Sequence, residues 1–468
     1  MQAGKKIVCW IIRIFLIYLI FVLASCIFPP LVHKKSDGSD AVSNGKNGMD
    51  AERVLCIDDN QEALLWRLRM IEEAQEEVVL TTFDLRDDNS GKDVMAALLR
   101  ASNRGVRIKV LVDGINAFLH LKGSGYFRAL AACENVEIKI YNPVNLLLPW
   151  KLNYRMHDKY VIADNFAYIL GGRNTNDLFL GEYRKSYNID RYILVYEKET
   201  HGMDVKDTSL GKLREYFDEI WNLSCSRLVS YREKNLKTKE AKELEALSEG
   251  LERKWPEAFK KVDWEKETSA CEEIVLLTNP CEAVNKEPIL WADLCRIMDG
   301  GQDVIIETPY IICGRDMYEA LTRLNAGRRV QIITNAVESG ANPSGCTDYL
   351  NQKDNILDTG SEVYECLAGQ SVHTKTILVD QDISIVGSYN LDMRSTYLDT
   401  EMMLVIKSRK LNEQLWAQAQ EAMDFSKHVT EDGTEEYGKY YKTRELPFGK
   451  KCMYGVLRIL TYPIRQVL

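Results

Sequence analysis

The stretch that decides the fold reads MHDKYVIADNFAYILGGRN over residues 156–174, and it recurs as VHTKTILVDQDISIVGSYN over residues 372–390. Both copies follow the pattern His-x-Lys-x4-Asp-x6-Gly-(Gly/Ser)-x-Asn. The chain has only six histidines, and two of them stand at matching positions of these identically spaced motifs. The spacing argues for a duplicated functional motif rather than for two unrelated polar hairpins.

Each copy consists of a hydrophobic run, a short polar turn and a second hydrophobic run, which predicts a strand, a turn and a strand. The turns fall at Asp164 and Asp380. The His and the Lys of each copy are two residues apart, so we expect them to project from the same face of an extended segment.

The residue types of the motif suit a phosphate group. A Lys ammonium and an Asn amide can donate to phosphate oxygens, and glycine lets the backbone approach a ligand closely. A histidine beside them can act as a nucleophile or as a proton donor. The predicted phosphate-binding residues, besides the two lysines, are Asn174, Asn390, Gly172 and Ser388.

The duplication extends beyond the motif, because the hydrophobic run at 304–310 parallels 78–84 and the run at 327–333 parallels 105–111. In the first copy, we expect helices over 63–73 and 92–104 and strands over 78–83 and 106–112. Alternation of this kind predicts an α/β fold made of two duplicated domains, each a mixed sheet flanked by helices.

Length and composition narrow the possible functions. A chain of 468 residues is long enough for two domains. Its net charge of −9 disfavours a generic nucleic-acid binder, which usually has a basic surface. The twelve cysteines form no C-x-x-C pair, so we predict neither a metal site nor a disulfide framework.

The N-terminal segment predicts attachment to a membrane. Residues 7–28 form a nearly unbroken apolar run, which is long enough to span a bilayer. Residues 23–26 also match a bacterial lipoprotein processing site, which would make Cys26 the lipidated residue. We favour a signal anchor, and in both cases expect the catalytic domains on the outer face of the cell membrane.

The expected organisation follows these signals along the chain. It comprises an anchor or lipoprotein signal (1–33), a flexible linker (34–51), a first domain (52–225), a charged helical linker (226–270), a second domain (271–446) and a basic amphipathic C-terminal segment (447–468). The last segment has no acidic residue, and it suits either a lipid interface or packing on the domain.

The duplicated His-Lys-Asp motif resembles the signature of the phospholipase D superfamily, and the chain is most similar to bacterial cardiolipin synthases of that type. The resemblance covers residues 52–468 and includes Gly181 and the run from Gly387 to Ser395. Gly172 stands where many members of the superfamily have Ser, but the synthases commonly have Gly-Gly there. The membrane segment resembles the shorter kind of synthase anchor.

The resemblance implies a role for each motif residue. One histidine attacks the phosphorus and forms a phosphohistidine, while the other protonates the leaving alcohol and deprotonates the incoming one. By resemblance, His157 is the nucleophile and His373 the acid and base, while Lys159 and Lys375 stabilise the charge on the phosphoryl oxygens. Asp164 and Asp380 belong to the motif, and we interpret them as structural supports of its turns. The chemistry needs no metal or other cofactor.

In the superfamily, an acidic residue on a following strand orients each histidine. Two acidic residues fit this role, and we expect Asp190 to orient His157 and Glu401 to orient His373. The predicted active site lies at the interface between the two domains.

The resemblance predicts a membrane-anchored phosphatidyltransferase that makes cardiolipin from phosphatidylglycerol and a second phospholipid, for which phosphatidylethanolamine is one candidate. One alternative is a hydrolase that uses water on phospholipids or, less readily, on nucleic acids, because the sequence does not reveal how dry the cleft is. A catalytically inactive membrane scaffold is a further alternative, and the two intact motifs argue against it. We expect phospholipids and the membrane as partners, and no nucleic acid.

Overall fold

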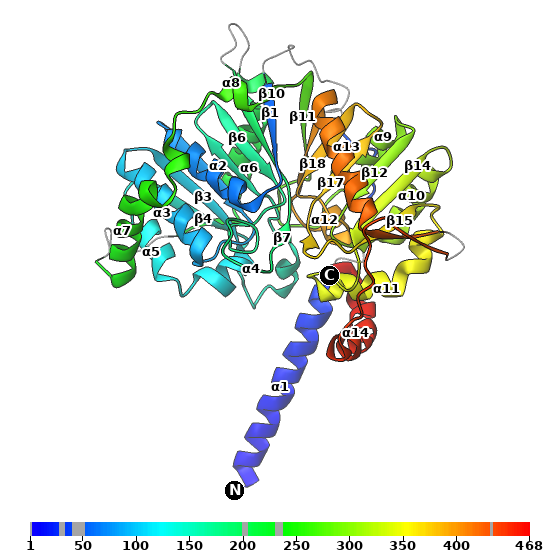
Figure 1. Ribbon diagram of the computed structural model, residues 1–468. Helices are drawn as coiled ribbons and strands as arrows, with labels where there is room; N and C mark the ends of the chain where they lie inside the picture. The colour runs from blue at the N-terminus through cyan, green and yellow to red at the C-terminus, as the bar shows by residue number, and fades with distance from the viewer. Residues whose placement is uncertain (1, 28–32, 40–51, 199–204, 230–236, 431–433) are drawn as a thin grey trace.

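Two α/β domains lie side by side, and one long helix, α1 (Gln2–Ile27), extends away from them (Figure 1). The computed structural model describes residues 2–27, 33–39, 52–198, 205–229, 237–430 and 434–468. Each domain is built on a nine-stranded mixed sheet.

Three neighbouring strands of the first sheet are parallel, with five antiparallel strands on one side of them and one on the other. The first of these parallel strands is buried at every position, because helices cover both faces of the sheet. The strand order is β10 (Ser269–Ala270), β1 (Glu52–Ile57), β8 (Tyr192–Glu197), β6 (Ala167–Gly171), β5 (Tyr160–Ala163), β2 (Glu77–Thr82), β3 (Arg107–Asp113), β4 (Val136–Tyr141) and β9 (Ser226–Leu228).

The second sheet repeats this arrangement, and its three parallel strands again come directly after the motif hairpin in the strand order. Its order is β11 (Glu273–Thr278), β20 (Met402–Lys407), β18 (Ile383–Gly387), β17 (Thr376–Val379), β12 (Asp303–Glu307), β14 (Arg329–Asn335), β15 (Glu362–Cys366), β21 (Ser426–Val429) and β22 (Glu435–Tyr437). Strands β1 and β11 occupy equivalent places, as do β5 and β17. The predicted duplicated α/β fold is therefore confirmed.

Helices form layers outside and between the sheets. The outer core of the first domain contains α2 (Asn60–Glu73), α3 (Asn89–Asn103), α5 (Gly125–Ala131) and α7 (Lys239–Lys254). That of the second contains α9 (Ile289–Asp299), α10 (Arg315–Asn325), α11 (Pro343–Leu357) and α12 (Met393–Tyr397). A third core joins both sheets to α6 (Ser209–Asn222) and α13 (Arg409–Asp424). The two domains therefore share a hydrophobic interior. The helices predicted over 63–73 and 92–104 are confirmed as α2 and α3, and the strands predicted over 78–83 and 106–112 as β2 and β3.

Short elements complete the description. Two small strand pairs form outside the large sheets, β7 (Asn188–Ile189) with β16 (Ser371–Val372) and β13 (Ile311–Ile312) with β19 (Leu391–Asp392). The remaining helices and turns are α4 (Gly114–Asn116), η2 (Ala117–Leu121), η3 (Pro149–Asn153), η4 (Val205–Asp207), η5 (Pro256–Phe259), α8 (Trp264–Glu267), α14 (Phe448–Thr461) and η6 (Tyr462–Val467).

The described residues of the segment 226–270, which we expect to be a charged helical linker, include strands and a helix that pack on the first domain. Its first and last strands, β9 and β10, form the two outer edges of the first sheet. Helix α7 packs on α3 and α5 and buries Leu244 and Leu251. These leucines are seven residues apart, so they make a narrow apolar stripe that the surrounding charges obscure in the sequence.

Part of the predicted flexible linker is docked on the second domain. The carboxylate of Asp293 in α9 accepts hydrogen bonds from the backbone N–H of Ser39 at 2.8 Å and from its hydroxyl at 2.6 Å. The ring of His33 stacks on Tyr397 with centroids 3.9 Å apart. The rest of that linker, 40–51, lies outside the described residues, as does the side chain of Cys26.

Helix α1 contains the stretch Lys6–Ser25, in which no residue is buried and which is long and apolar enough to cross a membrane. Its C-terminal end packs on η3 and η6, and α14 packs on α11 and η6. Both α1 and α14 therefore lie on the same side of the two-domain body (Figure 1).

Candidate active site

The two motifs meet where the domains meet. The backbone N–H of His157 in the first domain donates to the carbonyl of Thr400 in the second, at 3.3 Å. The backbone N–H of His373 in the second domain donates to the carbonyl of Ile189 in the first, at 2.7 Å. Each histidine is therefore held by the backbone of the opposite domain.

The predicted relation between each histidine and its lysine fits the geometry around His157. His157 and Lys159 directly precede β5, and Asp158 between them points away and accepts a hydrogen bond from Tyr216 of α6 at 2.8 Å. The ammonium of Lys159 donates to the carbonyl of His157. Alternation along an extended segment therefore places the imidazole and the ammonium on one side, as expected.

The carboxylates pair with the histidines crosswise, so the expected pairing within each half is wrong. Nδ1 of His157 lies 2.8 Å from Oε1 of Glu401, and Nδ1 of His373 lies 2.6 Å from Oδ2 of Asp190. The reason is the pairing of β7 with β16 and the bridge between Met156 and Thr400, which carry each carboxylate to the other domain's histidine.

The surroundings of Glu401 are hydroxyl groups. Ser388 donates to Oε2 of Glu401, and Ser395 donates to Oε1 at 2.6 Å. Asp392 caps α12 by accepting from the backbone N–H of Ser395 at 2.6 Å, which fixes that serine in place. Burial raises the pKa of Glu401 to about 8. The predicted phosphate ligand Ser388 therefore contacts the orienting carboxylate.

The surroundings of Asp190 are different. Oδ1 of Asp190 accepts from the backbone N–H of Arg191 at 2.7 Å. A Cβ atom added to Gly172 would lie 2.4 Å from Oδ1, so glycine at this position leaves room for the carboxylate. Burial opposes the charge, but Lys375 and His373 outweigh it and hold the pKa of Asp190 below its usual value. Asp190 is therefore held ionised.

The two lysines are buried close to the imidazoles. Nζ of Lys375 lies 2.7 Å from Nδ1 of His373 and 3.2 Å from Nε2. Burial lowers the pKa of Lys159 to about 7 and that of Lys375 to about 8, because little water reaches either ammonium. The charge of each lysine also acts on the histidine of the other motif. A phosphate anion at this position would favour the charged form of both lysines.

Both imidazoles favour their neutral form. Burial and the neighbouring Lys159 lower the pKa of His157 well below its usual value. Burial and Lys375 lower the pKa of His373 to about 4, although Asp190 opposes this shift. A neutral imidazole has a free nitrogen lone pair, which a nucleophile needs.

The two asparagines occupy matching, buried places. Within the described part of the chain, Oδ1 of Asn174 and Oδ1 of Asn390 are buried without a hydrogen-bond partner. The amide of Asn390 donates to the hydroxyl of Tyr310 at 3.2 Å. Unpaired buried polar atoms are costly, and they are common where a ligand binds. These atoms are acceptors, and a phosphodiester has no hydrogen to donate to them. A 180° turn of either amide would present its NH2 group in the same place, and that group fits the predicted role at the phosphate.

Asp164 and Asp380 lie at the opposite end of the sheets from the histidines. Asp164 accepts hydrogen bonds from the backbone N–H groups of residues 75–77, and Asp380 accepts from those of residues 302–303. Both residues adopt positive φ angles of 44° and 49° in the turns of the motif hairpins. This geometry supports our interpretation of these aspartates as turn supports.

Several neighbours of the site were not predicted. Phe83 and Phe179 lie edge-on to His157 and His373, with ring centroids 4.9 and 5.0 Å apart. Arg394 forms an ion pair with Asp399 at 2.9 Å, and its charge lowers the pKa of His157 further. Phe83 directly follows β2. Its position at the end of the strand predicted over 78–83 is the sequence feature that could have indicated a residue of the site.

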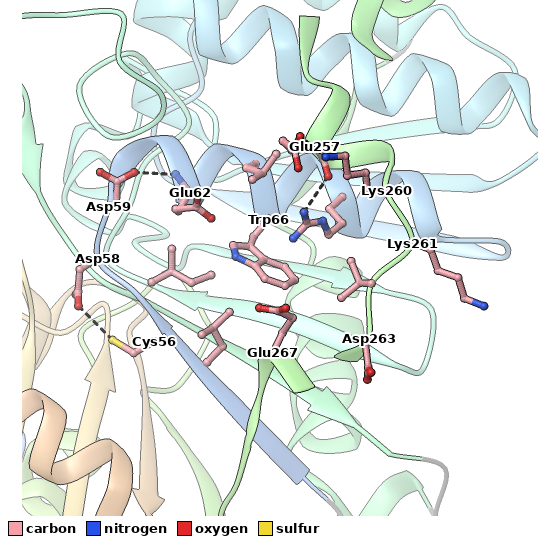
Figure 2. A pocket seen from close by; sticks show the side chains of 15 residues that line it. Cys56, Asp58, Asp59, Glu62, Trp66, Glu257, Lys260, Lys261, Asp263 and Glu267 are labelled. Atoms are coloured by element: carbon pink, nitrogen blue, oxygen red, sulfur yellow. Dashed lines mark hydrogen bonds and ion pairs between the residues drawn. The ribbon is translucent and has the colours of Figure 1, made fainter. Parts of the chain in front are cut away.

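A separate cavity of about 620 Å³ lies between α2 and the segment 257–267 (Figure 2). Trp66, Glu62 and Lys260 are among its lining residues, and none of the lining residues belongs to either motif. Within the described ranges, no group of three or more His, Cys, Asp or Glu side chains could hold a metal ion.

The duplicated sheets and the two histidine motifs at their interface define the phospholipase D class of protein. A family model described as "Cardiolipin synthase, PLD-like domain" matches residues 68–221 and 294–423. The chain belongs to this family.

Individual relatives agree with this assignment. Cardiolipin synthase C of Escherichia coli is 24% identical over 398 residues, which cover 76% of this chain and 81% of the synthase. An uncharacterized protein of Helicobacter pylori is 24% identical over 401 residues, which cover 76% of each chain. The crystal structure of phosphatidylserine synthase from Haemophilus influenzae has the same fold, with a TM-score of 0.59, 17% identity and coverage of 92% of this chain and 99% of that one.

Proposed function

We propose that the protein is a membrane-anchored phosphatidyltransferase that makes cardiolipin from phosphatidylglycerol and a second phospholipid. The observation that carries this proposal is the pair of buried imidazoles, each held by a carboxylate of the opposite domain and each beside a buried lysine. The family match and the cardiolipin synthase relatives support a phospholipid as the substrate.

In the first half of the reaction, one imidazole attacks the donor phospholipid. The lone pair of Nε2 of His157 forms a bond to phosphorus, and the bond from phosphorus to the headgroup oxygen breaks. The other imidazole, His373, gives its proton to the departing alcohol. The products are a phosphatidyl-histidine and a free headgroup alcohol.

In the second half, the glycerol hydroxyl of phosphatidylglycerol replaces the headgroup. His373 takes the hydroxyl proton, the oxygen attacks phosphorus, and the bond to His157 breaks. This step restores both imidazoles and releases cardiolipin. Lys159 and Lys375 offset the negative charge that grows on the phosphoryl oxygens in both halves.

The carboxylates support this division of roles. Asp190 opposes the lowering of the pKa of His373, and a bound phosphate anion would raise that pKa further, toward the protonated imidazole that an acid catalyst requires. Glu401 has a pKa raised to about 8, so near pH 7 it favours its neutral form. A neutral carboxyl group stabilises a protonated His157 less than a carboxylate would. These surroundings favour His157 as the nucleophile and His373 as the acid and base.

The exposed apolar stretch Lys6–Ser25 supports anchoring in a membrane. An anchored enzyme keeps its active site within reach of lipid substrates. The anchor also argues against nucleic acids as the natural substrate.

The test uses the full-length protein in vesicles of phosphatidylglycerol, with and without phosphatidylethanolamine, and identifies the products by mass spectrometry. Cardiolipin with an equal amount of free glycerol or ethanolamine is the expected result, and the alcohol identifies the donor. Phosphatidic acid without cardiolipin would instead establish a hydrolase. Product from a His157→Ala protein at the normal rate would refute the catalytic assignment.

A matched control is available in β21. His428 stacks on Tyr364, outside both motifs, with ring centroids 4.6 Å apart. We expect the His428→Ala protein to keep the rate of the unaltered protein, so that loss of activity at His157 or His373 reports the motif rather than a general effect of removing an imidazole.

A further inference from the structure

Exposed apolar side chains form three groups, and two of these, next to η3 and on α14, lie on the side of the body from which α1 extends (Figure 1). Two of the three groups lie in loops that follow β3 and β4, and the third lies on α14. The most exposed members are Phe118 and Leu119 in η2, Leu146 and Leu147 before η3, and Phe448, Val456, Ile459 and Leu460 in α14. Exposed apolar groups on one side of a protein mark an interaction surface.

The contacts of helix α1 indicate how deep in a bilayer this side of the body would lie. The hydroxyl of Tyr18 donates to the carbonyl of Leu146, and the ring of Phe21 packs edge-on to Trp150 with centroids 6.4 Å apart. Tyr18 and Phe21 both belong to the apolar stretch that ends at Ser25. A helix rises about 1.5 Å per residue, so Tyr18 lies about 10 Å along the helix axis from the C-terminal end of that stretch. If α1 crosses a bilayer, Leu146 reaches the same depth.

Helix α14 has two distinct apolar faces. Tyr454, Thr461 and the partly buried Leu457 pack toward the domain. Val456, Ile459 and Leu460 lie on the opposite face and are 58%, 76% and 60% exposed. The helix is therefore packed on the body along one side, and its second apolar side is largely exposed.

The charges around α14 fit an anionic lipid surface. Lys450 and Lys451 are exposed in the first turn of α14, and the exposed Arg458 donates to Asn351 and Leu350 of α11. No acidic residue occurs between Leu446 and the C-terminus. A helix with a large exposed apolar face and neighbouring cations is typical of the membrane interface, where the cations meet anionic headgroups.

These surfaces are linked directly to the active site. Trp150 precedes His157 by seven residues in the chain. The guanidinium of Arg394 donates to the carbonyl of Asn153 in η3 at 2.8 Å and to that of Val467 in η6 at 3.1 Å. The same arginine pairs with Asp399, which directly precedes Thr400 and Glu401.

We propose that the loop 145–150 and the exposed face of α14 are embedded in the lipid leaflet at the C-terminal end of α1, so that the body rests on the membrane at three points. This inference rests on the membrane anchoring proposed above. The occupant of the apolar surface is the bilayer itself, and its anionic headgroups meet the cations of α14. The loop that carries His157 then begins inside the leaflet and runs from there toward the level of the phospholipid phosphates.

The test measures depth and needs no turnover, so its failure differs from failure of the proposed reaction. A fluorophore is attached at one position in Leu147→Cys, Ile459→Cys or Glu249→Cys proteins, after Cys9 and Cys452, which are exposed, are replaced by serine. Glu249 is an exposed residue of α7, which lies at the edge of the first domain away from α14 (Figure 1), and it provides the control. The full-length proteins are placed in phosphatidylglycerol vesicles with brominated or ordinary acyl chains.

We expect brominated chains to quench the labels at 147 and 459 at least about threefold more than the label at 249, because they lie in the hydrocarbon region. Iodide in the water should quench the label at 249 about threefold more than the other two. Equal quenching by iodide at all three positions would refute the proposal. Shielding of position 459 from both quenchers, with cross-linking between two labelled chains, would show that a second copy covers this face and would also refute it.

A second measurement uses activity. The Val456→Asp/Ile459→Asp protein places two carboxylates on the exposed face, where they do not disturb the stripe packed on the domain. We expect its ratio of reaction rates in vesicles and in detergent micelles to fall about tenfold, because charge is costly at the interface. An unchanged ratio, compared with a Glu249→Asp control, would contradict the proposal for α14.

Discussion

His157 and His373 occupy matching places in the two halves of the molecule, yet their surroundings differ in chemical character. Glu401 reaches His157 and is held by two serine hydroxyls, and burial raises its pKa to about 8. Asp190 reaches His373 and is held by a backbone N–H beside Gly172, and nearby cations keep it ionised. The duplicated halves have thus diverged where the catalytic roles of the imidazoles would have to differ.

The divergence centres on one pair of equivalent positions. Ser388 donates a hydrogen bond to Glu401, whereas Gly172 provides space for the shorter, charged carboxylate. A reaction with two imidazoles needs one neutral and one protonated partner at its start. The difference between glycine and serine at this position favours that division.

The largest expected effect comes from removing the histidines one at a time. We expect His157→Ala and His373→Ala each to lower cardiolipin formation by about ten-thousandfold or more. With a donor whose leaving group needs no proton, such as a p-nitrophenyl phosphodiester, the His373→Ala protein should still form a phosphohistidine, whereas His157→Ala should not. Trapping the intermediate by rapid quench and mass spectrometry checks this. The opposite result would reverse the roles of the two imidazoles.

Neutralising Asp190 and Glu401 in turn should lower the reaction rate to different extents. We expect Asp190→Asn to lower the rate about a thousandfold, because it removes a charge that stabilises the protonated His373. Glu401→Gln should cost about tenfold, because Gln resembles the protonated Glu401 that burial favours. Steady-state rates at pH 7 test both expectations. Equal losses of rate in the two proteins would show that the two carboxylates contribute equally to catalysis.

The pH dependence of stability provides an independent check on Glu401. Burial raises its pKa from 4.5 to about 8, so between these values the folded state retains a proton that the unfolded state releases. Its contribution to stability is therefore fully present below about pH 4.5 and is lost as the pH rises toward 8. The melting temperature of Glu401→Gln, relative to the unaltered protein, should rise from pH 5 to pH 8. A constant difference would contradict the raised pKa.

A smaller contrast is expected at the equivalent glycine and serine. A methyl group at Gly172 would press on Oδ1 of the fully buried Asp190, so Gly172→Ala should lower the rate about tenfold to a hundredfold through misplacement of His373. Ser388→Ala removes one hydrogen bond to Glu401 and should cost about threefold to tenfold. Rates of both proteins, with far-ultraviolet circular dichroism as a control for folding, test the order.

The smallest effect on catalysis is expected at the turns. Asp164 accepts three backbone hydrogen bonds and Asp380 accepts two, all remote from the histidines. We expect Asp164→Ala to lower the free energy of unfolding by about 3 kcal/mol and Asp380→Ala by about 2 kcal/mol, at about 1 kcal/mol per bond. The rate at 25 °C should change by less than about twofold. A tenfold loss of rate in either protein would give these aspartates a role in the site.

The motif hairpins were predictable because their information is local. Hydrophobic runs on either side of Asp164 and Asp380 predict two strands joined by a turn, and β5–β6 and β17–β18 confirm them. Recurrence of the same pattern predicts the duplication, because each copy repeats the same local signals. These features depend only on neighbours within about twenty residues.

The crossed pairing was not predictable in this way. Asp190 follows the first motif closely in the sequence, and nothing local indicates that the short strand before it pairs with β16 of the other domain. Likewise, the charges of α7 hide the two leucines that fix it to α3. Both outcomes depend on which surfaces meet after folding, and sequence spacing alone does not determine that.

The crossed pairs of β7 with β16 and of Met156 with Thr400 also bear on the descent of the chain. Each half holds an imidazole without its orienting carboxylate, so a single ancestral copy would have had a complete site only by associating with another copy. Gene fusion would then have preserved an arrangement that began as an exchange between identical subunits. Once the two copies were joined, each could change independently, and the difference between Gly172 and Ser388 is one such change.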